Sequence, residues 1–138
     1  MKDDEFFFDE QDSPVNLDGK TILIVDDIEI NIELIREILE GTNIKILVAN
    51  NGQQAINICK QFENIDIILM DIQMPIMNGY EATRQIKLLR PELPVIAQTA
   101  YAFAEDVSKC LAAGCDDYIA KPFDQSKLIE LLMRNLKS

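Results

Sequence analysis

Carboxylate side chains follow two apolar stretches of this sequence. Asp71 comes directly after residues 67–70 (IILM), and Asp26 and Asp27 come directly after residues 21–25 (TILIV). Short apolar runs bounded by polar residues are typical of strands that are buried on both faces, as in a parallel sheet covered by helices. In open α/β sheets, ligands bind at the carboxyl ends of the strands, so we expect these acids to lie where chemistry takes place.

Two other side chains complete a candidate site. Thr99 follows the apolar run at residues 94–98, and Lys121 follows the run at residues 117–120. Carboxylates held close together repel one another and need a counter-ion, and ligation by oxygen alone suits a hard divalent cation, Mg²⁺ first. A nucleophilic carboxylate beside a cation, a hydroxyl and an ammonium forms a phosphoryl-transfer site. The predicted product is an aspartyl phosphate.

Each of these residues, taken alone, also has an ordinary structural interpretation. An acid pair after a strand commonly caps a helix, as Asp26 and Asp27 would do. Thr99 alone is more often a strand-end hydroxyl, and Lys121 alone is usually a surface residue. Their joint position at the carboxyl ends of four predicted strands favours the site.

The elements that position these residues alternate along the chain. Five apolar runs that predict strands are each followed by a segment with helical spacing; the runs cover residues 21–25, 44–49, 67–71, 94–99 and 117–120. Strict alternation predicts parallel pairing, right-handed crossovers and helices on both sheet faces. We therefore expect an α/β fold, a flavodoxin-like doubly wound five-stranded parallel sheet of strand order 2-1-3-4-5 with five helices. Strands 1 and 3 are neighbours in that order, which brings the three carboxylates together.

Helix boundaries are indicated by glycine and asparagine. Gly41 and Gly114 are expected to stop the first and fourth helices, and Asn50 or Asn51 to cap the second. A third helix, from about residue 79 to 89, is expected to bury three apolar side chains: Ala82, Ile86 and Leu89. The remaining helical positions are marked by Ile28, Ile32, Ile35, Leu39, Ala55, Ile56, Cys59, Phe62, Val107, Cys110, Leu111, Leu128, Leu131, Leu132 and Met133.

The length and the charge of the chain limit the number of domains and the classes of ligand to be expected. At 138 residues the chain fits one domain, and seven acids against one lysine in residues 1–18 indicate an acidic disordered tail or linker before a domain at 19–138. Phe6, Phe7 and Phe8 within that tail are unusual there, and docking on a partner or on the domain is one interpretation. The net charge of −11 argues against direct nucleic-acid binding. The absence of histidine excludes histidine triads and histidine metal sites.

Targeting signals and cysteines point to the cytoplasm. No apolar run approaches the roughly 20 residues of a membrane span, so no membrane insertion is expected. The acidic N-terminus differs from a secretory signal. Three cysteines without zinc-type spacing indicate free thiols in a reducing compartment.

Four segments together resemble a known family. Residues 25–27 (VDD), 70–79 (MDIQMPIMNG), 99–100 (TA) and 118–123 (YIAKPF) look like the receiver domain of two-component response regulators. The resemblance runs from about residue 20 to residue 136. The 70–79 segment is highly specific, and its order relative to the acid pair and the Lys-Pro pair strengthens the identification.

The resemblance implies a role for each matching position. Asp71 would be phosphorylated by a phosphohistidine on a separate protein or domain, with Mg²⁺ held by Asp26, Asp27 and Asp71 and by the backbone carbonyl of Gln73; Asp26 would act partly through water. Lys121 would pair with the phosphoryl group, aimed inward by a cis Lys121-Pro122 peptide, and Thr99 would hydrogen-bond to it. Tyr118 would be the switch aromatic; its ordinary interpretation is a half-buried strand residue.

The resemblance also implies a signalling role. Phosphorylation would change the surface of the fourth helix, the fifth strand and the fifth helix. The chain would be a signalling phosphoacceptor, not an enzyme in the usual sense, catalysing only its own phosphorylation and slow dephosphorylation. A histidine kinase or a histidine phosphotransfer domain would be its partner, and it would be a monomer or weak homodimer. Bulky Tyr101, with Gln73 near the path of attacking water, is expected to lengthen the phosphate lifetime.

Two other functional classes, and two kinds of protein from which the chain could come, stay open. A Mg²⁺-dependent phosphatase would usually carry its second acid where this chain has Gln73. A pseudo-receiver would lack one of the site residues, and none is missing. Flavin binding is disfavoured because the turn after the first strand is acidic. With two residues after Leu136, we expect no DNA-binding output domain; residues 112–118 (AAGCDDY) favour a receiver from a hybrid histidine kinase over a stand-alone regulator.

Overall fold

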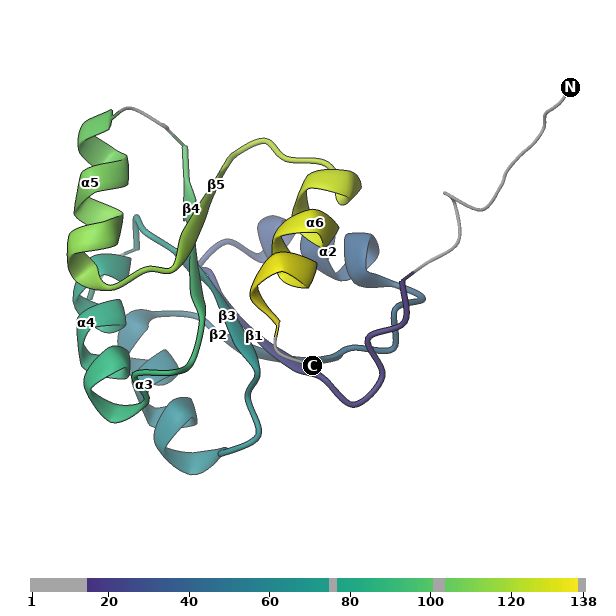
Figure 1. Cartoon of the computed structure of the whole chain (residues 1–138), viewed down its shortest axis with the longest axis horizontal. Coiled ribbons are helices and arrows are strands. Elements are labelled where there is room, and N and C mark those ends of the chain that lie inside the picture. Colours follow the sequence, from purple (N-terminus) through teal and green to yellow (C-terminus); the bar gives the residue numbers. More distant parts are fainter. Residues whose placement is uncertain (1–14, 75–76, 101–103, 137–138) are drawn as a thin grey trace, which may run out of the picture.

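A computed structural model describes residues 15–74, 77–100 and 104–136 (Figure 1). Within these ranges the chain alternates five strands with five helices, as the apolar pattern predicted. Their order is β1 (Thr21–Val25), α2 (Glu29–Leu39), β2 (Lys45–Ala49), α3 (Gly52–Gln61), β3 (Ile67–Asp71), α4 (Gly79–Leu89), β4 (Val95–Thr99), α5 (Ala104–Ala113), β5 (Asp117–Ala120) and α6 (Gln125–Asn135).

The strands form one parallel sheet. Its order is β2-β1-β3-β4-β5, which confirms the predicted 2-1-3-4-5 topology. Val25 of β1 is paired with Met70 of β3, so the residues that follow, Asp26 and Asp71, extend from neighbouring strands at the same edge of the sheet. Asp71 is in turn paired with Gln98 of β4. The topology therefore brings the first, third and fourth strand ends together.

Helices cover both faces of the sheet. Figure 1 shows α3, α4 and α5 on one face and α2 and α6 on the other. Side chains alternate between the two faces along each strand, so β1 sends Leu23 into the core under α3, α4 and α5 and Ile24 into the core under α2 and α6. Because both faces are covered, the central strands are mostly apolar, and all five residues of β1, β3 and β4 are buried.

Helix ends follow the predicted signals. Of the two candidate asparagines, Asn51 caps α3 by accepting a hydrogen bond from the N–H of Gln54 at 2.8 Å. Gly41 and Gly114, after the last residues of α2 and α5, have φ of 89° and 106°, a left-handed conformation that favours glycine. The described helices are too short and too polar for any of them to cross a membrane.

Two features of the fold differ from the sequence pattern. Leu89, predicted to be buried, is 46% exposed. It is the last residue of α4, and Leu93 from the following turn packs into the core beside this helix. Leu17 falls in the segment assigned to the acidic tail, yet it is buried under α2 and α6, and its N–H donates to the carbonyl of Thr42 at 2.6 Å. Phe6, Phe7 and Phe8 lie outside the described residues.

Candidate functional site

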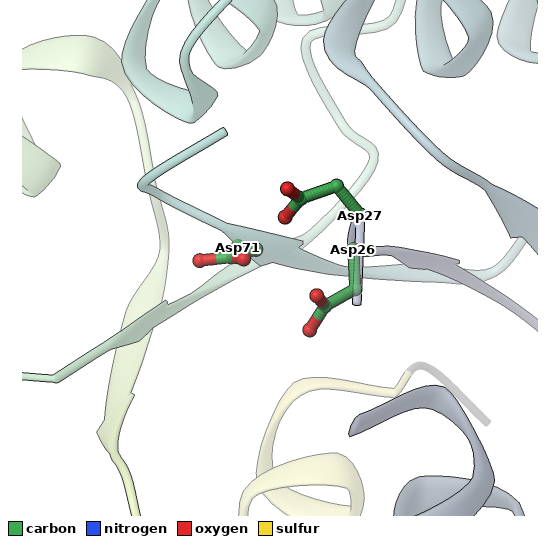
Figure 2. Close-up of side chains that lie close together, drawn as sticks. All are labelled: Asp26, Asp27 and Asp71. Atoms are coloured by element: carbon green, nitrogen blue, oxygen red, sulfur yellow. The ribbon is translucent and has the colours of Figure 1, made fainter. Parts of the chain in front are cut away.

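Three carboxylates meet at the carboxyl edge of the sheet. Oxygen atoms of Asp26, Asp27 and Asp71 all lie within 4.8 Å of one another. Figure 2 shows Asp26 and Asp27 leaving the end of β1 in different directions, with Asp71 beside them at the end of β3. The strand register alone accounts for this convergence, because the two strands end side by side.

Burial differs sharply among the three acids. Asp26 is fully buried and Asp71 is 4% exposed, whereas Asp27 is open to solvent. Asp26 Oδ1 accepts a hydrogen bond from the N–H of Ile28 at 3.0 Å, but its Oδ2 is buried without a hydrogen-bond partner among the described residues. A buried carboxylate oxygen left in this way is destabilising. Asp26 therefore presents an oxygen that a cation would satisfy.

The local environment disfavours a charged Asp71. Burial raises the pKa of Asp71 from 3.8 to about 6, opposed by the Lys121 ammonium and reinforced by the charge of Asp26. The N–H of Gln73 also lowers this pKa by donating to Asp71 Oδ1 at 3.1 Å, while Asp27 raises it. A cation beside Asp71 would favour its charged form and lower this pKa.

Lys121 reaches the acid cluster from the end of β5. Its Nζ lies 3.7 Å from Asp71 Oδ1 and 3.9 Å from Asp26 Oδ2. The Lys121-Pro122 peptide bond is cis, as the resemblance implied. These two distances show that one partly exposed ammonium faces two buried carboxylates.

Thr99 and Gln73 border a hollow beside Asp71. The hollow has a volume of about 480 Å³ and is lined by Thr99 of β4, by the loop that follows β3, and by Asp106 and Lys109 of α5. Thr99 is 7% exposed. The hollow therefore lies beside the adjacent ends of β3 and β4, next to the residue that follows Asp71. Tyr118, the second residue of β5, is 37% exposed.

Gly79 holds the loop after β3 against the site, and the sequence pattern did not identify it. A Cβ at this position would meet the carbonyl oxygen of Asp71 and lie 2.8 Å from Ile72 Cα. The N–H of Gly79 donates to the carbonyl of Ile72 at 3.0 Å, and the adjacent Asn78 caps α4 by accepting from the N–H of Glu81 at 3.0 Å. The start of α4 is therefore packed directly on the backbone of Asp71.

The donor set fits a hard divalent cation. Three carboxylates within 4.8 Å supply oxygen ligands only, and the unsatisfied Oδ2 of Asp26 faces this cluster. Neither imidazole nor thiolate takes part, which disfavours the softer transition metals. The N–H of Gln73 donates to Asp71 Oδ1 at 3.1 Å, which holds the backbone of the loop after β3 beside the cluster.

Comparison with known proteins relates this chain to one family. Residues 22–133 match the family model described as the response regulator receiver domain. The signal transduction histidine-protein kinase BarA of Escherichia coli (strain K12) is 42% identical over 116 residues, which cover 83% of this chain but 12% of BarA. The chain spans only 12–14% of the length of the first histidine kinases that it matches.

Solved structures give the same relationship. The receiver domain of sensor histidine kinase PA1611 from Pseudomonas aeruginosa, with magnesium in its active-site cleft, aligns with a TM-score of 0.80 at 36% identity and covers 87% of this chain and 99% of that one. The receiver domain of Saccharomyces cerevisiae Ssk1, crystallised with the histidine phosphotransfer protein Ypd1, aligns with a TM-score of 0.79 at 30% identity, covering 86% of this chain and 89% of that one.

Proposed function

The chain belongs to the response regulator receiver domain family, and from this premise we propose that it accepts a phosphoryl group on Asp71 from a phosphohistidine. One observation carries the proposal: Asp71 is buried at a strand end with two other carboxylates within 4.8 Å and the Lys121 ammonium 3.7 Å away. A buried carboxylate next to a cation site and an ammonium is equipped to attack phosphorus.

The proposed reaction exchanges one bond to phosphorus for another. A carboxylate oxygen of Asp71 attacks the phosphorus in line and forms the acyl phosphate. The P–N bond of the phosphohistidine breaks, and the imidazole leaves with the bonding electron pair. Lys121 offsets the charge on the phosphoryl oxygens, and Thr99, on the wall of the adjoining hollow, donates a hydrogen bond to one of them. Hydrolysis by water later returns the carboxylate.

A Mg²⁺ ion is the cofactor that we propose for this reaction. Asp26, Asp27, Asp71 and the backbone carbonyl of Gln73 would hold it, with Asp26 acting partly through water. When bound, the ion supplies positive charge that offsets both the repulsion among the carboxylates and the charge of the transferred group. The magnesium in the PA1611 receiver domain supports this assignment.

The phosphodonor is proposed to be a histidine kinase or a histidine phosphotransfer domain. The chain contains no histidine, so the donor must lie on another protein or on another domain. Beside the acid pair, Ile28, Ile30 and Leu34 are 47%, 68% and 53% exposed at the start of α2, an apolar surface suited to a partner helix. The complex of Ypd1 with the Ssk1 receiver domain supports a partner of this kind.

Output is proposed to depend on Thr99 and Tyr118. A phosphoryl group on Asp71 would draw the hydroxyl of Thr99, shift the loop after β4 and let Tyr118 turn inward. The surface of α5, β5 and α6, the fourth helix, fifth strand and fifth helix of the predicted order, would then change. Beryllofluoride with Mg²⁺ should bury the Tyr118 ring, observed by NMR of its ring protons, in the wild type but not in Thr99→Ala. An unchanged ring environment would contradict this mechanism.

Phosphate lifetime is proposed to depend on two positions near the attacking water. Gln73 lies on the wall of the hollow beside Asp71. Tyr101 lies outside the described residues, so the shielding role proposed for its ring stays a prediction. It is tested by comparing dephosphorylation rates of the wild type and Tyr101→Ala; an unchanged rate would reject it. We also propose a cytoplasmic location and a monomeric or weakly dimeric state.

Intact mass after incubation with acetyl phosphate tests the proposed function. The wild type should gain one phosphoryl group, about 80 Da, in the presence of Mg²⁺. The gain should disappear with EDTA and in Asp71→Ala, while Asp18→Ala, which removes an exposed acid far along the sequence, should leave it unchanged. No adduct on the wild type would reject phosphotransfer and favour a pseudo-receiver that only binds proteins. Turnover of a phosphomonoester substrate would favour a phosphatase.

A further inference from the structure

Gln98 is a polar residue buried where the fold has no evident use for it. It lies in β4 between Ala97 and Thr99 and is 1% exposed. Both its Nε2 and its Oε1 are buried without a hydrogen-bond partner among the described residues. An amide in this state is destabilising, because it has lost its hydrogen bonds to water and gained none. Structural packing alone would favour an apolar residue at this position.

The sheet register places Gln98 between the two central residues of the site. On one side it is paired with Asp71 of β3, and on the other with Ile119 of β5. Lys121 lies two residues beyond Ile119 and therefore on the same face of the sheet as Gln98, at the diagonal position that long side chains can reach. Gln98 thus lies on the strand between the one that ends on Asp71 and the one that Lys121 follows.

A cavity gives both side chains room to meet. Gln98 and Lys121 line one cavity of about 430 Å³ under α2, whose other walls are five apolar residues and the polar residues Asn31 and Glu37; the apolar ones are Leu34, Ile35, Ile38, Pro122 and Phe123. The final torsion of a glutamine side chain is soft, so its amide can turn within such a space at little cost. Of the three acceptors in this lining, Glu37 is exposed and Asn31 is half-buried, whereas Gln98 is buried in the sheet.

The Lys121 ammonium has hydrogen-bonding capacity left over. Its distances to Asp71 Oδ1 and Asp26 Oδ2, 3.7 and 3.9 Å, allow electrostatic attraction but exceed hydrogen-bond length. An ammonium has three N–H donors. A neutral acceptor next to it could hold the lysine in place without adding another negative charge to the acid cluster.

We propose that Gln98 is a positioning residue for Lys121: its Oε1 accepts a hydrogen bond from the Lys121 ammonium and keeps that ammonium inside the site before a phosphoryl group arrives. The inference rests on the proposed function for its consequence, because a lysine held beside Asp71 is available to the incoming phosphoryl oxygens at once. The proposed hydrogen bond gives the buried amide of Gln98 a role in the site, which packing alone does not explain.

Proton exchange of the Lys121 ammonium tests the inference without metal or phosphate. In ¹⁵N-lysine NMR of the Mg²⁺-free protein, with Lys121→Arg used to assign the signal, Gln98→Met should speed exchange of the ammonium protons by about threefold to tenfold. Met has a similar length and no acceptor oxygen of this kind. Gln98→Glu keeps an acceptor and should keep exchange slow. Equal exchange rates in Gln98→Met and the wild type would overturn the proposal, as would fast exchange in Gln98→Glu.

Stability and phosphorylation kinetics separate positioning from packing. Gln98→Met should melt at the wild-type temperature or above it, since it removes a buried amide whose Nε2 has no hydrogen-bond partner among the described residues, yet acetyl phosphate should phosphorylate it about threefold to tenfold more slowly. In the Lys121→Ala background the same substitution should leave the rate unchanged. An equal slowing in both backgrounds would overturn the proposal, and Gln98→Leu replaces Met if that variant does not fold. A wild type that takes up no phosphate would instead refute the proposed function. The proton-exchange experiment would then decide the role of Gln98 by itself.

Discussion

The ammonium nitrogen of Lys121 lies 3.7 Å from Oδ1 of Asp71. Lys121 follows β5, at one edge of the sheet, whereas Asp71 ends the central strand β3. The two residues are therefore far apart in the sequence; the order β3-β4-β5 brings them together. The pair sets the charge of the site. Burial raises the pKa of Asp71, and the lysine is the strongest influence that lowers it.

Removing the lysine charge should separate metal affinity from phosphorylation. In Lys121→Ala the acid cluster loses its neighbouring cation, so we expect Mg²⁺ to bind more tightly, by about fivefold, while acetyl phosphate labels Asp71 more slowly. Mg²⁺ titration followed by NMR and intact-mass kinetics measure the two effects. Lys60→Ala removes the same charge from the exposed surface of α3 and should change neither. Weaker Mg²⁺ binding in Lys121→Ala would contradict the electrostatic account.

Neutralising Asp71 should stabilise the metal-free protein. Because the pKa of Asp71 is raised from 3.8 to about 6 in the folded state, its contribution to stability is present below about pH 4 and is lost as the pH rises through 6. At pH 7.5 in EDTA, Asp71→Asn should therefore raise the free energy of unfolding by about 2 kcal/mol. Urea unfolding at pH 7.5 and pH 5 measures this gain, which should be smaller at pH 5. The gain should be absent from Asp18→Asn, and a pH-independent gain would reject the mechanism.

The sequence predicted the architecture because the local signals agreed with one another. Apolar runs ending on Asp26, Asp71, Thr99 and Lys121 alternate with helical spacing, and only a parallel sheet with helices on both faces satisfies that pattern. The strand order then placed the acids together, as the structure does. The acid convergence could therefore be predicted from strand ends alone, whereas the role of each residue came from the resemblance and awaits experiment.

What the sequence could not predict depends on contacts between distant elements. Leu89 fits the apolar stripe of α4, but its exposure depends on where the helix ends and on Leu93 reaching the core. The close approach of Gly79 to Asp71 depends on how the loop after β3 folds back. Gln98 had a visible signal, a polar residue inside an apolar strand, but its meaning appears only with the register to Asp71 and Lys121.

A side chain at position 79 should displace the backbone that carries Asp71. In Gly79→Ala the new Cβ would collide with backbone atoms of Asp71 and Ile72, which cannot move without shifting the end of β3. We expect a loss of about 1–3 kcal/mol in the free energy of unfolding and slower phosphorylation of Asp71. Leu88→Ala, at an 84% exposed position of the same helix, should change stability by no more than about 0.5 kcal/mol. Stability equal to the wild type in Gly79→Ala would show that the loop is not packed against Asp71.

Acid sensitivity should depend in part on Asp117 at the start of β5. Burial alone would raise the pKa of Asp117, but hydrogen bonds from Arg134 at 2.8 Å and Asn135 at 3.1 Å outweigh it, and the pKa is lowered. A lowered folded-state pKa contributes stability that is present above the ordinary value near pH 4 and is lost as the pH falls below it.

Asp117→Asn should consequently be less stable than the wild type at pH 7, by about 1 kcal/mol at most because Arg134 is largely exposed, and the difference should shrink as the pH falls from 5 to 3. Urea unfolding across that range measures it. Glu63→Gln, an exposed acid in the loop before β3, is the matched control and should follow the wild type at every pH. A difference that stays constant down to pH 3 would mean that Asn135 and Arg134 bind the asparagine as well as the carboxylate, and the ion pair that joins β5 to α6 would then have no role in acid unfolding.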